Sequence, residues 1–363
     1  MSRHVLIAAG GTGGHISPGI ALVEYLSEHK EDLGISDITI HSLYRNRDNP
    51  DLIDSPVPVQ WHNLPQLNWK SLYKLPIILF HILKSILSLK KLGITDVIAM
   101  GGYSCLPSLL YAVLFKKNIY LCEQNRIIGK VVRLFQSRAT KIAFSFPPVN
   151  LDLSEVKDYR VLGNPLRSKI FPTEGVISKK IKDLAKAEKI NVLVMGGSQG
   201  ARQINNMVLS SMNHQDIVIH FNFRVLTGTN LYEETREKSK HSIDLISYSQ
   251  DMKTHYEWAN LVIARSGAGV ISECVLHGLP TILIPYPYAM DNHQLENAKY
   301  CEEFCGALMI NQTSEDDSAL IQILLSTIEN KQILKDLSEK SLNCSKPNAT
   351  RDTIEYFLSP ESK

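Results

Sequence analysis

Two glycine-rich segments, one in each half of the chain, have the residue types to bind an anion. Residues 10–15 (Gly-Gly-Thr-Gly-Gly-His) follow the apolar run 5–9, and residues 196–202 (Gly-Gly-Ser-Gln-Gly-Ala-Arg) follow the apolar run 192–195. A strand that ends in glycines and leads into a helix leaves unpaired backbone N–H groups at the positive end of the helix dipole, which suits phosphate. The two segments predict two similar α/β domains that face one cleft, where a nucleotide meets a second substrate.

His15 follows the first glycine cluster, at an expected helix start. The positive end of a helix dipole disfavours the imidazolium form, so a neutral ring there could accept a proton near pH 7. A histidine hydrogen-bonded to the backbone of a turn is the alternative, and spacing alone leaves both open. The cluster is not the dinucleotide fingerprint, because Ile16 stands at the third glycine position, and it lacks the Gly-Lys-Ser/Thr of a Walker loop.

Alternating strand and helix patterns surround both segments, which favours α/β domains with parallel sheets and helices on both faces. Strands are expected at residues 5–9, 38–42, 97–100, 119–121, 141–144, 192–195, 218–226, 261–263 and 281–284. Helices are expected at residues 19–29, 77–91, 107–115, 127–135, 203–213, 269–277, 294–303 and 318–329. The repeated alternation predicts a Rossmann-like architecture in each half.

A Gly-Asn-Pro-Leu-Arg segment at residues 163–167 is typical of a domain crossing, because its glycine permits a turn and its proline bars a helix. It predicts a first domain at residues 1–163 and a second at 164–347. Pro347 interrupts the chain again. The amphipathic stretch 350–358, within an expected C-terminal helix at 348–363, could pack back against the first domain.

Composition fits a globular protein of two domains, with 363 residues, 44% apolar and 21% charged. Six cysteines are too few for a disulfide scaffold and fit a reducing cytosol. Cys301 and Cys305, one helical turn apart, are expected to be two buried thiols and not metal ligands, because no second Cys/His pair lies nearby. No secretory signal is expected, since the apolar N-terminal run is five residues long and ends in glycines.

Basic residues are concentrated between Trp69 and Lys141, where twelve face only two acidic residues, although the whole chain carries a net charge of +2. Within this window the apolar stretch 75–92 is interrupted by lysines, so it is too short to span a membrane. A buried helix is one interpretation of this stretch. The other is an apolar patch that rests on an anionic bilayer. Nucleic acid is not expected as a partner, because the interleaved residues are Leu, Ile and Phe at helical spacing.

The chain resembles the MurG family of bacterial glycosyltransferases, glycosyltransferase family 28. The matching motifs occur in the family's order from the first ten residues to about Ala298. They are the first glycine loop with His15, Ile16 and Pro18, then residues 101–103, 123–125, 163–167, 196–202, 265–268, 272–273, 278–280, 285–288 and 291–294. The resemblance implies the two-domain glycosyltransferase-B fold and transfer of N-acetylglucosamine from UDP-N-acetylglucosamine to lipid I, giving lipid II for peptidoglycan synthesis.

The resemblance also implies roles for individual residues. His15 becomes the base that activates the sugar hydroxyl of the acceptor. The implied UDP-N-acetylglucosamine site consists of Thr12, Gly13, Gly14, Asn125, Arg167, Ser198, Ala268, Gly269, Val270, Ile271, Ser272, Glu273 and Gln294. The first domain then handles the acceptor and the membrane, the second the donor, and the enzyme lies at the cytoplasmic face of the inner membrane.

Each donor residue has a purely structural alternative. The N–H groups of residues 268–270 would face the diphosphate, and Glu273 would accept bonds from the ribose hydroxyls, or else complement a helix dipole. The amide of Gln294 suits sugar hydroxyls, although a solvated helix start would also explain it. Asn125 and Arg167 could simply form turns.

No cofactor is expected. The sequence has no Asp-x-Asp motif, so no metal is implied, and helix N-termini would neutralise the departing diphosphate. Alternative functions are a glycosyltransferase with a diacylglycerol or natural-product acceptor, a UDP-sugar epimerase, and a non-catalytic nucleotide-sugar-binding subunit.

Overall fold

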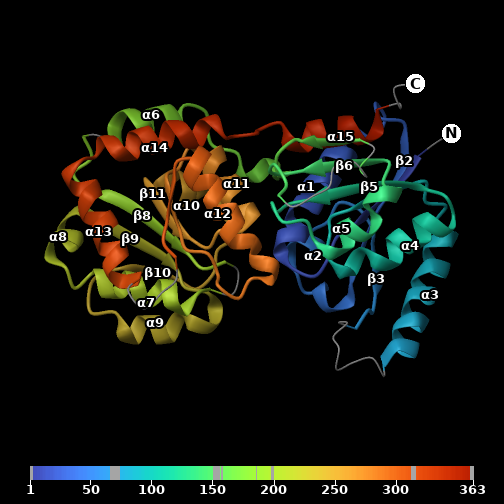
Figure 1. The fold of residues 1–363 in the computed structure, drawn as a ribbon, viewed down its shortest axis with the longest axis horizontal. Helices are drawn as coiled ribbons and strands as arrows, with labels where there is room; N and C mark the ends of the chain where they lie inside the picture. Colours follow the sequence, from blue (N-terminus) through green and yellow to red (C-terminus); the bar gives the residue numbers. More distant parts are fainter. Residues whose placement is uncertain are drawn as a thin grey trace. The chain divides into compact units, whose positions relative to one another are not determined.

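The computed structural model describes residues 3–65, 74–149, 156, 158–184, 186–197, 200–311 and 316–359. The chain divides into two compact units: Met1–Arg167 with Pro347–Lys363, and Ser168–Lys346. Each unit is an α/β fold with one parallel sheet (Figure 1), so the expected fold class is confirmed.

The first unit has a seven-stranded sheet in the order β3-β2-β1-β4-β5-β6-β7, with every neighbouring pair parallel. Its strands are β1 (Arg3–Ala8), β2 (Ile35–Leu43), β3 (Val59–His62), β4 (Asp96–Ala99), β5 (Asn118–Glu123), β6 (Lys141–Phe144) and β7 (Tyr159–Val161). Its helices are α1 (Gly13–Glu28), α2 (Pro50–Ile53), α3 (Leu75–Lys91), α4 (Leu106–Leu114), α5 (Lys130–Phe135) and α15 (Ala349–Leu358).

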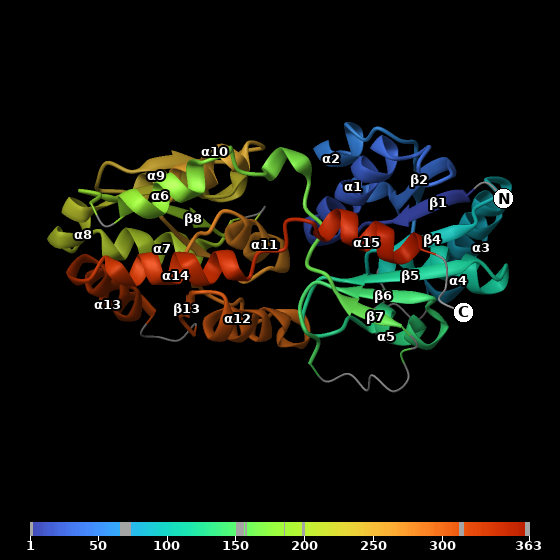
Figure 2. The same cartoon turned by 90° about the horizontal axis from the view of Figure 1, so that it is seen from above.

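Both faces of the first sheet are apolar because side chains alternate along each strand. In β1, Leu6 and Ala8 belong to the cluster that packs under α3 and α4, whereas Val5 and Ile7 belong to the cluster under α1. Helix α15 completes the second cluster and packs beside α1 (Figure 2). Lys141 Nζ donates to the Tyr356 carbonyl at 2.7 Å, where a cation complements the carboxyl end of the helix.

The second unit has a six-stranded parallel sheet in the order β10-β9-β8-β11-β12-β13. Its strands are β8 (Ile190–Met195), β9 (Phe221–Leu226), β10 (Asp244–Ile246), β11 (Leu261–Ala264), β12 (Thr281–Leu283) and β13 (Ala307–Met309). Its helices are α6 (Val176–Leu184), α7 (Arg202–Ser211), α8 (Gln215–His220), α9 (Tyr232–Lys238), α10 (Met252–Trp258), α11 (Ala268–Leu276), α12 (His293–Phe304), α13 (Asp316–Glu329) and α14 (Gln332–Asn343).

Each sheet has one point where the strand order reverses. In the first unit it lies between β1 and β4, whose last residues Ala8 and Ala99 are in register. In the second it lies between β8 and β11, where Met195 and Ala264 are in register. Parallel sheets bind ligands outside the carboxyl ends of the strands at such a reversal. Both glycine-rich segments follow the strand on one side of it.

One expected strand is partly wrong. The β-branched run that favours a strand at residues 218–226 contains the end of α8 up to His220, and β9 begins only at Phe221. Ile217 is buried while Ile219 is exposed, so the run presents one side to the core as a helix does. Helix α8 packs there against α13, and this tertiary contact outweighs the local preference for strand.

The prediction that Cys305 is a buried free thiol, made from its spacing to Cys301, is also wrong. It forms a disulfide with Cys344, 39 residues further along the chain, which joins the end of α12 to the end of α14. Cys301 is buried and lies outside the disulfide. A partner so far along the chain leaves no signal in local spacing.

Candidate active site

His15 lies in the first turn of α1, directly after the glycines that follow β1. Thr12 is the residue before the helix, and its carbonyl accepts the backbone N–H of His15 at 3.1 Å. The Thr12 hydroxyl lies 3.3 Å from Nδ1 of the imidazole, within hydrogen-bond distance. The structure therefore places Thr12, Gly13, Gly14 and His15 together at the reversal point of the first sheet.

The imidazole of His15 lies against the backbone of Gly101 and Gly102, which follow β4 on the other side of the reversal point. A Cβ at Gly102 would lie 3.3 Å from Cε1 of the ring, and one at Gly101 would lie 3.4 Å from Nε2. Both glycines have positive φ, 89° at Gly101 and 74° at Gly102. Side chains are disfavoured at these positions by the backbone conformation and by the ring, so the glycines leave the space that the imidazole occupies.

Two buried serine hydroxyls lie beside Gly10 in the same region. A Cβ at Gly10 would lie 3.2 Å from the hydroxyl oxygens of both Ser42 and Ser104. Neither hydroxyl has a hydrogen-bond partner within the described part of the chain. Buried polar groups usually have partners, so these two are candidates to contact a substrate. Sequence reasoning missed them because serines carry no motif of their own.

Asn125 lies in the loop after β5 and is held by Glu123. Its backbone N–H donates to Glu123 Oε1 at 3.0 Å, and the Gly129 N–H donates to Oε2 at 2.7 Å. Burial raises the pKa of Glu123, and these backbone bonds oppose that rise. Glu123 therefore shapes the loop that carries Asn125, a role that the sequence motif alone does not reveal.

Arg167 pairs with two carboxylates of the first unit. Its guanidinium contacts Glu24 of α1 at 2.6 Å and also Asp51 of α2. The side chain is only 13% exposed. The pairs join the end of the first unit to α1 and α2, while the donor contact implied for Arg167 stays a prediction.

The second glycine-rich segment approaches the loop after β9 closely. A Cβ at Gly200 would overlap the carbonyl oxygen of Thr227, and Gly200 has a φ of 77°. Asn205 of α7 donates to that same carbonyl at 3.2 Å and to Thr235 of α9 at 3.2 Å. Ser198 and Gln199 lie outside the described residues, so the position implied for Ser198 stays a prediction.

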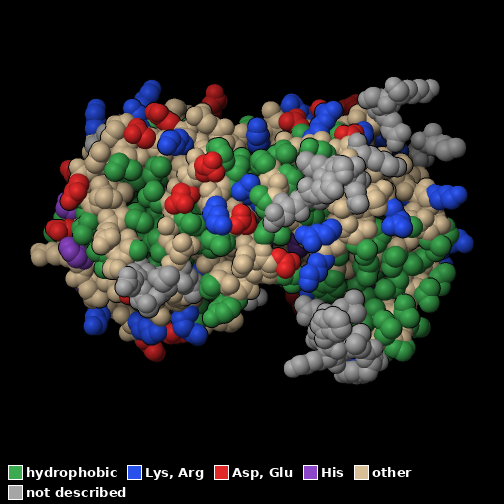
Figure 3. Space-filling view, in the orientation of Figure 1, with side chains coloured by type: hydrophobic (Ala, Val, Ile, Leu, Met, Phe, Trp, Pro, Cys, Tyr) green, Lys and Arg blue, Asp and Glu red, His purple; other side chains and the backbone are tan. Residues whose placement is uncertain are grey.

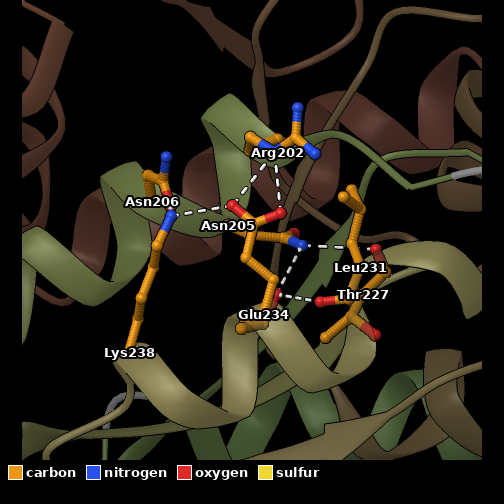
Figure 4. A network of polar contacts seen from close by, with 8 residues as sticks. Arg202, Asn205, Asn206, Thr227, Leu231, Glu234 and Lys238 are labelled. Carbon is orange, nitrogen blue, oxygen red and sulfur yellow. Dashed lines mark hydrogen bonds and ion pairs between the residues drawn. The ribbon is translucent and has the colours of Figure 1, made fainter.

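A polar network behind this segment ties α7 to α9 (Figure 4). Arg202 Nε, at the start of α7, donates to Glu234 at 2.9 Å, and Lys238 donates to the same carboxylate at 2.7 Å. Hydrogen bonds from both cations lower the pKa of Glu234. The network fixes the helix that follows the glycine-rich segment.

The loop after β11 opens α11 directly at the reversal point of the second sheet. The first intrahelical bond runs from the Ile271 N–H to the Gly267 carbonyl at 3.1 Å, so the N–H groups of residues 268–270 precede it. Gly269 has open space where a Cβ would be. Such a helix start can receive an anion.

Ile271 and Ser272 have buried side chains, and the Ser272 hydroxyl donates to the Ala268 carbonyl at 2.8 Å. The Ile271 N–H is also bonded within the helix, so the ligand contacts implied for Ile271 and Ser272 stay predictions. Glu273 is partly exposed, and it accepts a hydrogen bond from the hydroxyl of Tyr256 at 2.7 Å. Sequence reasoning missed Tyr256, which lies on α10.

Gln294 lies in the first turn of α12, beside the start of α11. Its backbone carbonyl accepts the hydroxyl of Ser266 at 2.7 Å, and Ser266 follows β11. Its side-chain oxygen accepts the N–H of Tyr286 at 2.9 Å, which orients the amide. The structure thus brings Gln294 and residues 266–273 together, whereas Asn125 and Arg167 lie in the first unit.

Helix α3 has an apolar outer face. Ile78, Ile82 and Leu89 pack into the core, but Phe80 is 62% exposed. Other exposed large apolar residues of α3 and α4 are Leu75, Ile77, Leu79, Leu83, Leu87, Val113 and Leu114. Figure 3 shows hydrophobic side chains gathered over this part of the first unit. The interpretation of α3 as a fully buried helix is therefore wrong.

Within the described part of the chain, no helix is long and apolar enough to cross a membrane.

Two family models match the chain: the glycosyltransferase family 28 N-terminal domain at residues 5–144 and its C-terminal domain at residues 191–354. A UDP-N-acetylglucosamine–N-acetylmuramyl-(pentapeptide) pyrophosphoryl-undecaprenol N-acetylglucosamine transferase from Leptospira interrogans is 52% identical over 98% of this chain and 99% of its own length. The transferase of the same name from Francisella philomiragia is 32% identical over 98% of this chain and 96% of its own length.

Solved structures share the fold at lower identity. The crystal structure of MurG from Acinetobacter baumannii has a TM-score of 0.77 at 22% identity and covers 98% of this chain and 99% of its own. A Listeria monocytogenes structure assigned as a UDP-N-acetylglucosamine 2-epimerase has a TM-score of 0.72 at 15% identity and covers 100% of this chain and 98% of its own.

Proposed function

Because the chain belongs to glycosyltransferase family 28, we infer that it transfers N-acetylglucosamine from UDP-N-acetylglucosamine to the muramyl sugar of lipid I, giving lipid II for peptidoglycan synthesis. The observation that carries this conclusion is 52% identity to the Leptospira transferase across 98% of the chain. The epimerase and natural-product glycosyltransferases share the fold at 11 to 15% identity, so they support the architecture and not an alternative activity.

His15 acts as the general base of this reaction. The acceptor hydroxyl gives its proton to the imidazole while its oxygen attacks the anomeric carbon of N-acetylglucosamine. The bond from that carbon to the diphosphate oxygen breaks, UDP leaves, and the anomeric configuration is inverted. The position of the ring beside Gly101 and Gly102 supports this role, because the absence of side chains there leaves room for the imidazole at the reversal point.

The contacts to the diphosphate and the ribose are assigned to the second unit. The N–H groups of residues 268–270 receive the diphosphate, Glu273 accepts the ribose hydroxyls, and the amide of Gln294 contacts the sugar. Developing charge on the leaving diphosphate is stabilised by these backbone dipoles. Ser198, Asn125 and Arg167 are further donor contacts in this proposal, as are Thr12, Gly13 and Gly14.

The acceptor is a lipid, and we propose that α3 brings the enzyme to the cytoplasmic face of the inner membrane as a peripheral protein. The apolar outer face of α3 is accompanied by exposed lysines at positions 84, 90 and 91. An apolar face beside basic residues binds anionic bilayers through burial and charge together.

Incubation of the purified protein with labelled UDP-N-acetylglucosamine and a lipid I analogue tests the activity. Label should appear in the lipid product, and UDP should be released in equal amount. Diacylglycerol as acceptor and an epimerase assay on UDP-N-acetylglucosamine alone are the comparison reactions. Turnover in either of these, without transfer to lipid I, would contradict the proposed function.

A further inference from the structure

Tyr256 is buried where it contacts the carboxylate assigned to the ribose. It lies on α10 with 0% of its surface exposed, and its hydroxyl donates to Glu273 Oε2 at 2.7 Å. Burial, and then the charge of Glu273, raise the pKa of Tyr256 well above its usual value. The phenol therefore keeps its proton and acts only as a donor toward the carboxylate.

Contacts to its backbone and to its ring constrain Tyr256. Lys180 of α6 donates to the Tyr256 carbonyl at 2.7 Å. The phenol ring contacts the ring of His277, with centroids 5.1 Å apart, and His277 Nε2–H donates to the Ile170 carbonyl at 2.8 Å. Tyr256 thus contacts α11 at Glu273 and again at His277, the residue after its last turn.

We propose that Tyr256 is a positioning residue that sets the affinity for the nucleoside diphosphate by holding the Glu273 carboxylate toward the ribose hydroxyls. This inference rests on the proposed function, which assigns Glu273 to the ribose. A glutamate side chain loses rotamer freedom when it binds a ligand. A fixed donor on one of its oxygens removes part of that cost before the ligand arrives.

Tyr256 does not touch the reacting atoms in this arrangement, so its loss should change donor binding and not turnover. We expect Tyr256→Phe to raise the KM for UDP-N-acetylglucosamine about fivefold. This is less than the loss of about tenfold or more that a missing hydrogen bond to a charged group can cause, because the bonds from Glu273 to the ribose can still form. The kcat should stay within about twofold of the wild-type value.

Calorimetry with two ligands separates positioning from a merely structural role. UDP and 2′,3′-dideoxy-UDP are titrated into the wild-type protein, Tyr256→Phe, Glu273→Ala and the double variant. We expect Tyr256→Phe to weaken the binding of UDP about fivefold and to leave the affinity for the dideoxy analogue unchanged. In the double variant the phenylalanine should add nothing to the loss caused by Glu273→Ala, because both act through one contact.

Tyr111→Phe is the matched control. Tyr111 is also buried, at 2% exposure, and its hydroxyl donates to the Ile94 carbonyl at 3.3 Å in the first unit. Its loss should change stability and leave the affinity for both ligands unchanged. The ratio of the two affinities is independent of the folded fraction, because both ligands bind the same folded molecules.

Three outcomes would overturn the inference. Equal weakening of both ligands by Tyr256→Phe would make the tyrosine structural. A second outcome is that Glu273→Ala weakens the binding of UDP more than that of the dideoxy analogue while Tyr256→Phe changes neither affinity. That result would contradict the role of Tyr256 and leave the proposed donor site standing. Equal affinity of the wild-type protein for UDP and the dideoxy analogue would contradict the ribose contact of Glu273. The positioning role of Tyr256 would fall with it.

Discussion

The two units place their candidate site residues at the strand-order reversal of a parallel sheet, yet the chemistry at the two points differs. In the first unit the loops after β1 and β4 bring an imidazole against glycine backbone. In the second, the segment after β11 provides a helix start and the Glu273 carboxylate, and the segment after β12 provides the Gln294 amide. The sheet therefore decides where a ligand can bind, and the side chains decide what happens to it.

The two points also differ in what holds them. The His15 ring occupies space left by two glycines with positive φ. The second glycine-rich segment is backed by the network of Arg202, Glu234 and Asn205, and Glu273 by the hydroxyl of Tyr256. Loss of His15 in the first unit should lower kcat, while loss of Glu273 in the second should raise KM, and this contrast can be tested.

The largest effect is expected from His15→Ala. Loss of the base should lower kcat by about 10² to 10⁴, and the KM for UDP-N-acetylglucosamine should change little because the second unit is intact. Steady-state kinetics with a lipid I analogue measure both constants. His241→Ala, an exposed histidine of the second unit, is the control. Near-normal turnover of the His15 variant would refute its role as base.

Glu273→Ala should give the opposite pattern. Removing a carboxylate that accepts ribose hydroxyls should raise the KM for the donor by about tenfold to a hundredfold and change kcat much less. Glu303→Ala, an exposed glutamate on α12, serves as the comparison. An unchanged KM in the Glu273 variant would argue that this carboxylate only complements the helix dipole.

Gly102→Ala separates backbone strain from contact with the imidazole. Gly102 and Gly34 both have positive φ, 74° and 64°, but only Gly102 has the His15 ring within reach of a Cβ. Both alanine variants should lose about 1 kcal/mol of unfolding free energy. Only Gly102→Ala should also lose kcat, by about tenfold, because the ring must shift.

Equal kcat losses in Gly102→Ala and Gly34→Ala would show that strain alone matters. Unfolding in urea, followed by circular dichroism, gives the stability of each variant, and kinetics on the folded fraction give kcat.

The apolar face of α3 extends the contrast to the membrane, because it belongs to the first unit. Replacing Phe80 and Leu83 with glutamate should reduce flotation with anionic vesicles severalfold, since each change adds a charge and removes apolar surface. Phe304→Glu, at a 51% exposed position on α12, is the matched control. Equal binding by all three proteins at low salt would remove α3 as the docking face.

Local signals explain what the sequence predicts well. Glycines directly after an apolar run mark both reversal points. The expected strand at residues 141–144 coincides with β6, and the one at 192–195 lies within β8. Short edge strands such as β7 and β10, each three residues long, give too few positions for a pattern. They depend on pairing with a neighbouring strand.

Long-range partners explain what the sequence does not predict. The Tyr256 hydroxyl meets Glu273 across 17 residues, and Arg167 meets Glu24 across 143. Neither separation along the sequence matches a helix or strand repeat, so no periodicity could indicate these contacts. The candidate residues follow from motifs, but the groups that orient them follow only from tertiary packing.

Acid stability compares the two units in a property that does not involve catalysis. Burial lowers the pKa of His62 in the first unit and of His277 in the second from 6.5 to about 4. The unfolded chain takes up these protons below pH 6.5, whereas the folded state excludes them. Stability is therefore fully present above pH 6.5 and lost as the pH falls toward 4, at about 1.4 kcal/mol per pH unit for each histidine.

His277→Gln should remove one such contribution and keep a donor for the Ile170 carbonyl. Between pH 6.5 and 5 its unfolding free energy should fall by about 2 kcal/mol less than that of the wild-type protein, as measured in urea. His62→Gln should do the same for the first unit, and His241→Gln, at an exposed position, should not. If neither buried-site variant flattens the pH dependence, other groups govern acid unfolding, and the two units do not share this sensitivity.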